Sequence, residues 1–164
     1  LSEFAEQGVL CRLAKGVYYK PVMTKFGVLM PDVQEIVKAI ARRDNAQVLP
    51  TGETAANLLG LSTQVPMNYV YLTSGSARKI MVGKKTVTFK RCVPKNFACQ
   101  NEFLAVLIQA MKAIGQERLT DGHCVVIKGL LMKHLPIESL DADMKNAPLW
   151  VRRMVYNIIK EIGV

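Results

Sequence analysis

The sequence predicts an α+β fold, and three observations support this prediction. Hydrophobic residues make up 50% and charged residues 21% of the 164 positions, as in a folded globular protein. Residues 9–91 hold short runs of β-branched and aromatic residues that end at glycine or proline, which is the pattern of strands and hairpins. From residue 99 onward, apolar residues recur at helical spacing. We therefore expect a mixed N-terminal and central part that contains a β-hairpin, followed by a helical C-terminal part.

The first residues predict the end of a helix followed by a hairpin. Residues 1–5 place three apolar side chains on one helical face, and Gly8 ends this helix. Residues 9–13 and 17–20 predict two strands joined by a tight glycine turn, and Pro21 ends the second strand. This order is typical of the second half of a winged helix, whose helix enters the DNA major groove and whose hairpin is the wing. A winged helix has two helices before this one, so we expect the sequence to open near the middle of the recognition helix.

Two helices are predicted between the wing and the central hairpin. Pro31 begins the first helix, and the two arginines at 42–43 lie in its last turn, where the helix dipole favours cations. Its inward face is expected to consist of Val33, Ile36, Val37 and Ile40. A second, short helix is predicted from Glu53 to Leu59, with Thr51 or Gly52 as its cap.

The middle of the chain predicts β-structure. Strands are expected at residues 69–73, 79–82 and 86–90, and the last two flank a hairpin turn at 83–85. In the last strand, threonine and lysine alternate with valine and phenylalanine. Because side chains alternate between the two faces of a strand, one face of this hairpin should be polar.

Four helices are predicted in the C-terminal part. The first should bury Phe103, Leu104, Leu107, Ala110, Met111 and Ile114. Thr120 caps the second, Ser139 begins a short third helix, and Pro148 begins the last one. The inward positions expected in the second and last helices are Ile127, Leu130, Leu131, Val151, Met154, Val155, Ile158 and Ile159.

Basic residues are unevenly distributed along the chain. The net charge is +9, and residues 51–95 alone hold seven bases and a single acid, Glu53. Six of these bases fall on or beside the predicted hairpin, namely Arg78, Lys79, Lys84, Lys85, Lys90 and Arg91. A one-sided basic surface attracts polyanions or an acidic partner. We therefore expect a basic patch that binds nucleic acid or a protein partner, with a merely solvated basic face as the alternative.

The sequence shows no pattern that indicates a metal site, a cofactor or a membrane segment. The four cysteines form no C-x-x-C pair, and the two histidines lack metal-ligand spacing with them, so we expect reduced, mostly buried thiols. The longest uninterrupted apolar stretch, residues 103–108, is too short to cross a bilayer. Residues 1–10 do not have the organisation of a signal peptide. These features predict a soluble, cytoplasmic protein that binds no metal or cofactor and has no membrane partner.

One enzymatic interpretation is a nuclease of the restriction-endonuclease type. Such enzymes hold Mg²⁺ with one acid and an acid-x-Lys pair on a hairpin. Here the hairpin offers Thr88-x-Lys90, with threonine where the second carboxylate belongs, and Glu53 is the only acid between Asp44 and Glu102. We therefore predict no catalytic activity. A nuclease-like, degenerate enzyme and a basic RNA-binding module remain the alternative interpretations.

Several segments are similar to those of one protein family. They are residues 8–21 (GVLCRLAKGVYYKP), 50–66 (PTGETAANLLGLSTQVP), 69–73 with 76–79 and 88–91, and 147–153 (APLWVRR). These segments resemble the antitoxins of type IV toxin–antitoxin systems, of the AbiEi type. The resemblance covers most of the chain, and the block from 51 to 66 is its more distinctive part.

The resemblance implies a bifunctional bacterial protein. In this family an N-terminal winged helix binds the promoter of its own operon, and the rest counters a nucleotidyltransferase-type toxin. Residues 1–21 would then be the remnant of the winged-helix DNA-binding domain, and residues 22–164 an antitoxin-like α+β domain. We expect a non-catalytic transcriptional regulator whose partners are DNA and, directly or indirectly, that toxin. The residues assigned to DNA in the wing are Arg12, Lys15, Tyr18 and Lys20, whose contacts with phosphate would supply affinity without sequence choice.

Overall fold

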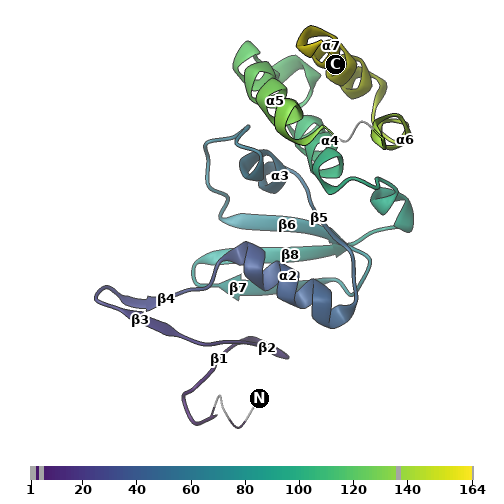
Figure 1. Ribbon diagram of the computed structural model, residues 1–164. Helices are drawn as coiled ribbons and strands as arrows, with labels where there is room; N and C mark the ends of the chain where they lie inside the picture. Colours follow the sequence, from purple (N-terminus) through teal and green to yellow (C-terminus); the bar gives the residue numbers. More distant parts are fainter. Residues whose placement is uncertain (1–2, 4–5, 136–137, 164) are drawn as a thin grey trace.

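A four-stranded sheet lies between two N-terminal hairpins and a C-terminal group of helices (Figure 1). The computed structural model describes residue 3 and residues 6–135 and 138–163. Its combination of helices and sheets confirms the predicted α+β fold. The helix predicted at residues 1–5 falls mostly outside the described residues, so the end of a recognition helix stays a prediction.

The predicted wing is a hairpin of β1 (Cys11–Ala14) and β2 (Val17–Tyr19), which pair antiparallel. Its turn contains Gly16 with a φ of 71°, a backbone conformation that glycine adopts without steric cost. The hairpin prediction is therefore confirmed, with the first strand beginning at residue 11 and not at residue 9.

A second hairpin follows directly and was not predicted from the sequence. It consists of β3 (Val22–Thr24) and β4 (Gly27–Leu29), and it protrudes from the molecule (Figure 1). The Thr24 hydroxyl holds the turn, because it accepts a hydrogen bond from the amide of Phe26 at 3.2 Å and donates to the carbonyl of Gly27 at 2.8 Å. We call residues 22–29 the arm.

The main sheet has the strand order β5-β6-β8-β7. Its strands are β5 (Val48–Pro50), β6 (Asn68–Thr73), β7 (Arg78–Val82) and β8 (Lys85–Arg91). Strands β7 and β8 form the predicted hairpin, while β8 pairs with β6 in parallel and β5 pairs with β6 antiparallel. Because β8 lies between β6 and β7, strand β7 is an edge of the sheet next to the wing.

Helix α2 (Val33–Asp44) crosses one face of this sheet (Figure 1). All four residues of its predicted inward face are buried. They share one core cluster with Tyr69, Tyr71, Ile80, Val82, Val87 and Phe89 of the sheet. Val17 of the wing belongs to the same cluster. The wing therefore packs against α2 and the main sheet through this residue.

The remaining helices are α3 (Glu53–Leu58), α4 (Glu102–Ile114), α5 (Asp121–His134), α6 (Leu140–Met144) and α7 (Leu149–Ile162). Helices α3, α5, α6 and α7 begin where the cap and proline signals predicted them, whereas the cap of α4, Asn101, was not predicted. The cap of α5 is confirmed, because the Thr120 hydroxyl accepts a hydrogen bond from the amide of His123 at 3.3 Å. Short 3-10 helices, η1 (Pro94–Phe97) and η2 (Gln116–Arg118), precede and follow α4.

A second core cluster joins these helices to β5. It contains most of the predicted inward positions of α4, α5 and α7. Four predicted core residues are only half-buried, namely Phe103, Ile114, Leu130 and Met154. Leu49 of β5 belongs to the cluster and Leu72 of β6 packs against it. The helical group therefore covers the β5–β6 side of the second sheet face and leaves much of β7 and β8 exposed there.

Candidate nucleic-acid interface

The wing presents cations to solvent while one of its residues is buried. Arg12, Lys15 and Lys20 are exposed, and Val17 faces the core. Arg12 pairs with Tyr18 across β1 and β2, so these two side chains lie on the same face of the hairpin. Tyr18 is half-buried. The four residues assigned to DNA are thus gathered on one small hairpin, and its three cations are accessible.

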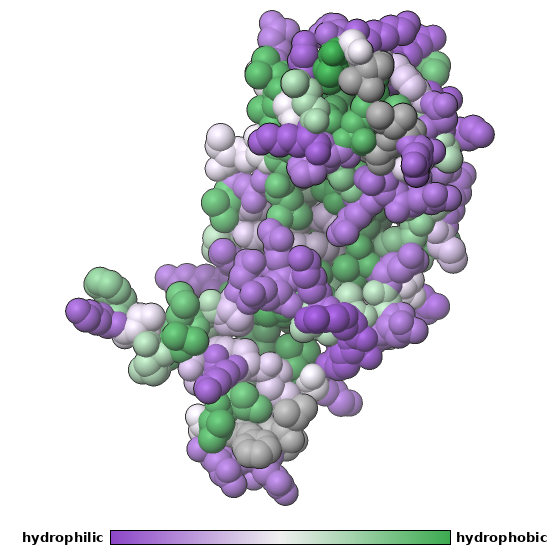
Figure 2. Space-filling view, in the orientation of Figure 1, coloured by the Kyte–Doolittle hydropathy of each residue, from purple (hydrophilic) through white to green (hydrophobic). Residues whose placement is uncertain are grey.

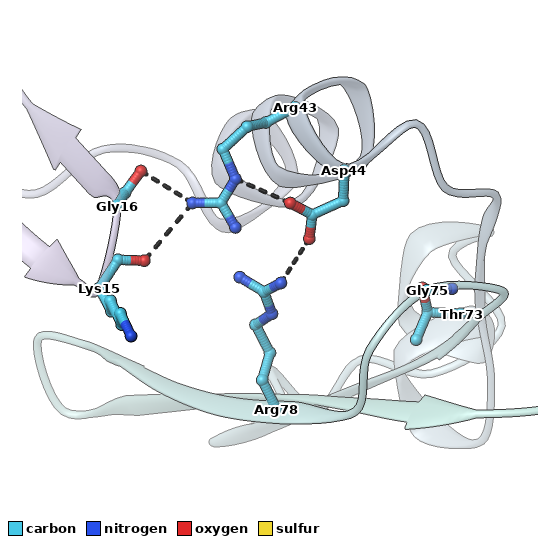
Figure 3. Close-up of polar contacts among 7 residues, drawn as sticks. All are labelled: Lys15, Gly16, Arg43, Asp44, Thr73, Gly75 and Arg78. Carbon is cyan, nitrogen blue, oxygen red and sulfur yellow. Dashed lines mark hydrogen bonds and ion pairs between the residues drawn. The ribbon is translucent and has the colours of Figure 1, made fainter.

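Arg43, at the end of α2, connects the wing turn with the sheet (Figure 3). Its Nη1 donates to the carbonyl oxygen of Gly16 at 2.8 Å and to that of Lys15 at 3.4 Å. Its Nε donates to one carboxylate oxygen of Asp44 at 2.8 Å. Arg78 of β7 donates to the other oxygen of Asp44 at 2.5 Å. A chain of polar contacts therefore holds the wing turn beside the end of α2 and the start of β7.

Asp44 is the only acid in this chain of contacts, and its carboxylate forms ion pairs with two arginines, Arg43 and Arg78. The hydrogen bond from Arg43 and the charge of Arg78 lower the pKa of Asp44, against the opposing effect of partial burial. A carboxylate that accepts hydrogen bonds in its charged form is stabilised in that form. The Asp44 carboxylate is thus ionised at neutral pH, and its negative charge is neutralised locally.

A groove of about 560 Å³ lies between the wing turn and the edge strand β7. Its charged lining residues are Lys15, Arg43, Asp44, Arg78 and Lys79. Four cations and one carboxylate thus line the groove, and this carboxylate is already paired with two of the four, Arg43 and Arg78. Arginine and lysine side chains in such an arrangement form charge-assisted hydrogen bonds with phosphate oxygens, so the groove is suited to an anionic backbone.

The six predicted basic-patch residues lie on one hairpin but are divided between its two faces. Arg78 and Lys85 are half-buried on the α2 side, where Arg78 forms the ion pair described above. Lys85 Nζ lies 5.6 Å from the centre of the Tyr69 ring, in a cation–π contact. Lys84 is exposed in the turn, and Arg91 is exposed at the end of β8. The expectation of a shared surface therefore holds for only some of these residues.

Lys79 and Lys90 lie on the opposite, open face of the hairpin. Lys79 pairs with Thr88 across β7 and β8, and Lys90 lies two residues further along β8. Both lysines are exposed, and Thr86 and Thr88 on the same face of β8 are half-buried. Because Lys79 also lines the groove beside the wing, it links this open face to the cations of the wing turn.

Sequence reasoning did not identify Arg43 as part of this surface. The pair at 42–43 was explained by the helix dipole, which accounts for its place in the last turn of α2. Arg43 is separated in the sequence from Gly16 by 27 positions and from Lys15 by 28. Its contact with the wing turn therefore depends on tertiary packing. The signal available in the sequence was a second basic cluster close to an acid, at residues 42–44.

The cysteines are free, but they are half-buried and not mostly buried as predicted. Burial and the neighbouring Asp143 raise the pKa of the Cys99 thiol to about 12. Within the described parts of the chain, no group of three or more histidine, cysteine or acidic side chains is placed to hold a metal ion. Over the same residues, no helix is long and apolar enough to cross a membrane.

The chain matches no curated protein and no solved structure. One family model matches it, over residues 1–139. The matched part comprises the wing, the arm, the sheet, and helices α2 to α5, and it ends before α6. The basic groove and the open face of β7 and β8 both lie inside it. The chain therefore belongs to DUF6088, a family of unknown function.

Proposed function

We propose that this protein is a non-catalytic, antitoxin-like transcriptional regulator that binds duplex DNA. The main support is the groove in which Lys15 of the wing lies beside Arg43, Arg78 and Lys79. These cations come from three separate elements, and the Arg43 contacts with the wing turn hold them together. A cluster of this kind raises the local potential far more than isolated surface charges do. Its ligand would be the phosphate backbone. The wing cations Arg12 and Lys20 would extend the surface that binds this backbone.

The alternative of an RNA-binding module has weaker support from the sheet. Sheet proteins that bind single-stranded RNA stack bases on exposed aromatic rings. The aromatic residues of this sheet, Tyr69, Tyr71 and Phe89, are buried beneath α2. The open face offers lysine, threonine and Met81 instead. Contacts with a phosphate backbone fit this surface better than base stacking does.

The nuclease-like alternative would need carboxylates on the hairpin. Strands β7 and β8 contain none, and Thr88 and Lys90 share the open face of β8 without an acid between them. Incubating the protein with plasmid, single-stranded DNA and RNA in Mg²⁺ or Mn²⁺ should leave all three intact. Cleavage that Lys90→Ala abolishes would replace the proposal with this alternative.

A binding assay with charge variants tests the DNA proposal. We expect Lys79→Ala and the double variant Arg78→Ala/Lys79→Ala to bind labelled duplexes more weakly than the wild type. The loss of affinity should be similar for duplexes of unrelated sequence, because phosphate contacts carry no sequence information. The matched control is Lys112→Ala/Lys160→Ala, which removes two exposed lysines from α4 and α7. Melting temperatures identify any loss that comes from breaking the Arg78–Asp44 ion pair. Unchanged affinity in both groove variants, or equal loss in the control, would contradict the proposal.

The antitoxin part of the proposal rests on the resemblance of residues 50–66 and 147–153 to the antitoxin family. It implies a bacterial protein that acts in the cytoplasm against a nucleotidyltransferase-type toxin. Cells that express such a toxin, encoded beside this gene, should resume growth when this protein is co-expressed. Repeating the experiment with the groove variants Lys79→Ala and Arg78→Ala/Lys79→Ala shows whether toxin neutralisation depends on DNA binding. Continued growth arrest with the folded wild-type protein present would remove this part of the proposal.

A further inference from the structure

The arm exposes apolar side chains on both of its faces. Val22 pairs with Leu29, and Met23 pairs with Val28, on opposite faces of the two-stranded ribbon. These four side chains are 48–73% exposed, and Phe26 at the tip is fully exposed. Figure 2 shows hydrophobic residues along the protruding arm at the left. An isolated two-stranded hairpin is marginally stable in water, and an exposed apolar surface of this kind marks an interaction site.

The chemistry of the arm favours a protein partner over nucleic acid. Lys25 is its only charged residue, whereas binding to a phosphate backbone relies on several cations. An apolar ribbon gains most from a surface that removes it from water on both faces. Its partner should therefore offer an apolar groove and a negative charge near the position of Lys25.

The same chain contains a groove with these properties, of about 380 Å³, between α2 and helices α3 and α4. Its apolar lining includes Val37, Leu58, Leu59 and Phe103, and its charged lining residues are Glu102 of α4 and Lys38 of α2. The floor includes Tyr71, which is only 4% exposed. Among the described residues, the hydroxyl of Tyr71 is the buried side-chain polar atom that has no hydrogen-bond partner.

A buried hydroxyl without a partner is unusual, because the lost hydration is not replaced. Burial raises the pKa of Tyr71 to about 12, so this phenol keeps its proton and is a hydrogen-bond donor. A ligand in the groove that carries a carbonyl oxygen would satisfy it. The edges of a two-stranded ribbon present unpaired carbonyl groups of this kind.

We propose that the arm of one chain docks in the α2–α3–α4 groove of a second copy, and that the second copy returns the contact with its own arm. Phe26 and Met23 enter the apolar groove, a carbonyl oxygen of the arm accepts the Tyr71 hydrogen bond, and Lys25 pairs with Glu102. Because arm and groove belong to the same chain, a two-fold axis repeats the contact. The two Phe26 side chains bury about 300–500 Å², and the other exposed apolar side chains of the two arms supply the rest of the roughly 1,200–2,000 Å² that a stable interface needs. The proposal does not depend on DNA binding.

Sedimentation of the full chain tests this proposal over protein concentrations from about 1 μM to about 1 mM. The wild type should move from the mass of one chain to that of two. Phe26→Asp in the arm and Leu58→Glu in the groove should each weaken dimerisation by more than about tenfold, and Tyr71→Phe should weaken it less. Val125→Asp removes an exposed apolar residue from α5 and is the matched control.

Two further outcomes identify the contact itself. Lys25→Glu and Glu102→Lys should each weaken the dimer, and the double variant should restore it. Monomeric Phe26→Asp and monomeric Leu58→Glu should form a mixed dimer, because one of them keeps its groove and the other keeps its arm. A wild-type chain that stays monomeric throughout the series overturns the proposal, even if the arm then captures DNA or a foreign protein. A dimer that survives Phe26→Asp also overturns it.

Discussion

The wing and the arm are consecutive hairpins of similar size, but only one of them packs against the rest of the protein. In the wing, Val17 is buried against α2 and the sheet, and Arg43 holds the carbonyl groups of the turn. In the arm, every residue from 22 to 29 is exposed. The anchored hairpin offers hydrated cations, and the protruding hairpin offers apolar side chains. A hairpin held by its own chain is suited to positioning charge, whereas one without such contacts is suited to docking on another molecule.

The largest difference in stability between the two hairpins should come from a valine-to-alanine substitution made in each of them. Val17→Ala removes two buried methyl groups and should lower the free energy of unfolding by about 1.5–2 kcal/mol. Val28→Ala removes the same groups from the exposed arm and should change it by less than about 0.5 kcal/mol. Urea denaturation at low protein concentration, where arm contacts between copies are absent, measures both values. Equal losses would mean that the arm is packed on its own chain as well as the wing is.

A smaller effect is expected from the glycine of the wing turn. Gly16 has a φ of 71°, and a Cβ there would lie 2.8 Å from Nη1 of Arg43. Gly16→Ala should therefore lower the free energy of unfolding by about 1–2 kcal/mol through backbone strain, and should speed amide exchange in β1 and β2. Gly129→Ala is the matched control, because Gly129 lies in α5 with open space around it, and alanine there should stabilise the helix by up to about 1 kcal/mol. If Gly16→Ala leaves the free energy of unfolding unchanged, the turn does not have the conformation and the Arg43 contacts described here.

The smallest stability effect concerns the anchor of the wing and depends on pH. Folding lowers the pKa of Asp44, so this carboxylate contributes stability above its ordinary pKa near 3.8, and the contribution is lost as the pH falls through the lowered value. Asp44→Asn should therefore destabilise the protein at neutral pH, by less than about 1 kcal/mol, and the difference from the wild type should disappear in acid. Thermal melting of both proteins between neutral and acidic pH measures this. A difference that grows in acid would contradict the assigned ion pairs.

The two hairpins also differ in how well the sequence predicted them. Gly16 between two β-rich runs identifies the wing, because glycine turns and alternation are local signals. The arm lacks a glycine or asparagine at the centre of its turn, and Thr24 holds that turn through its side chain instead. Strand β5 has three residues and ends in proline, so it carries too little pattern to be recognised. Elements with strong local signals were predicted, and these two short elements without such signals were not.

The candidate interface was predicted in its parts and not in its arrangement. Lys15 of the wing and Arg78 and Lys79 of the hairpin were named from the sequence, but as two separate surfaces. Placing them around one groove requires the packing of β1 beside β7, which is non-local. The division of the hairpin cations between two faces follows from strand alternation, but which face is covered depends on α2. Tertiary contacts therefore decide which of the predicted cations act together.

The salt dependence of duplex binding tests the central claim most directly, because it counts phosphate contacts at each hairpin. The slope of log K against log salt changes by about 0.9 for each phosphate neutralised. We predict that Arg12→Ala/Lys15→Ala/Lys20→Ala in the wing flattens this slope by up to about 3 and weakens binding equally for unrelated duplexes, whereas Lys25→Ala in the arm leaves the slope unchanged. An unchanged slope in the wing variant, or an equal change in the arm variant, would contradict the account.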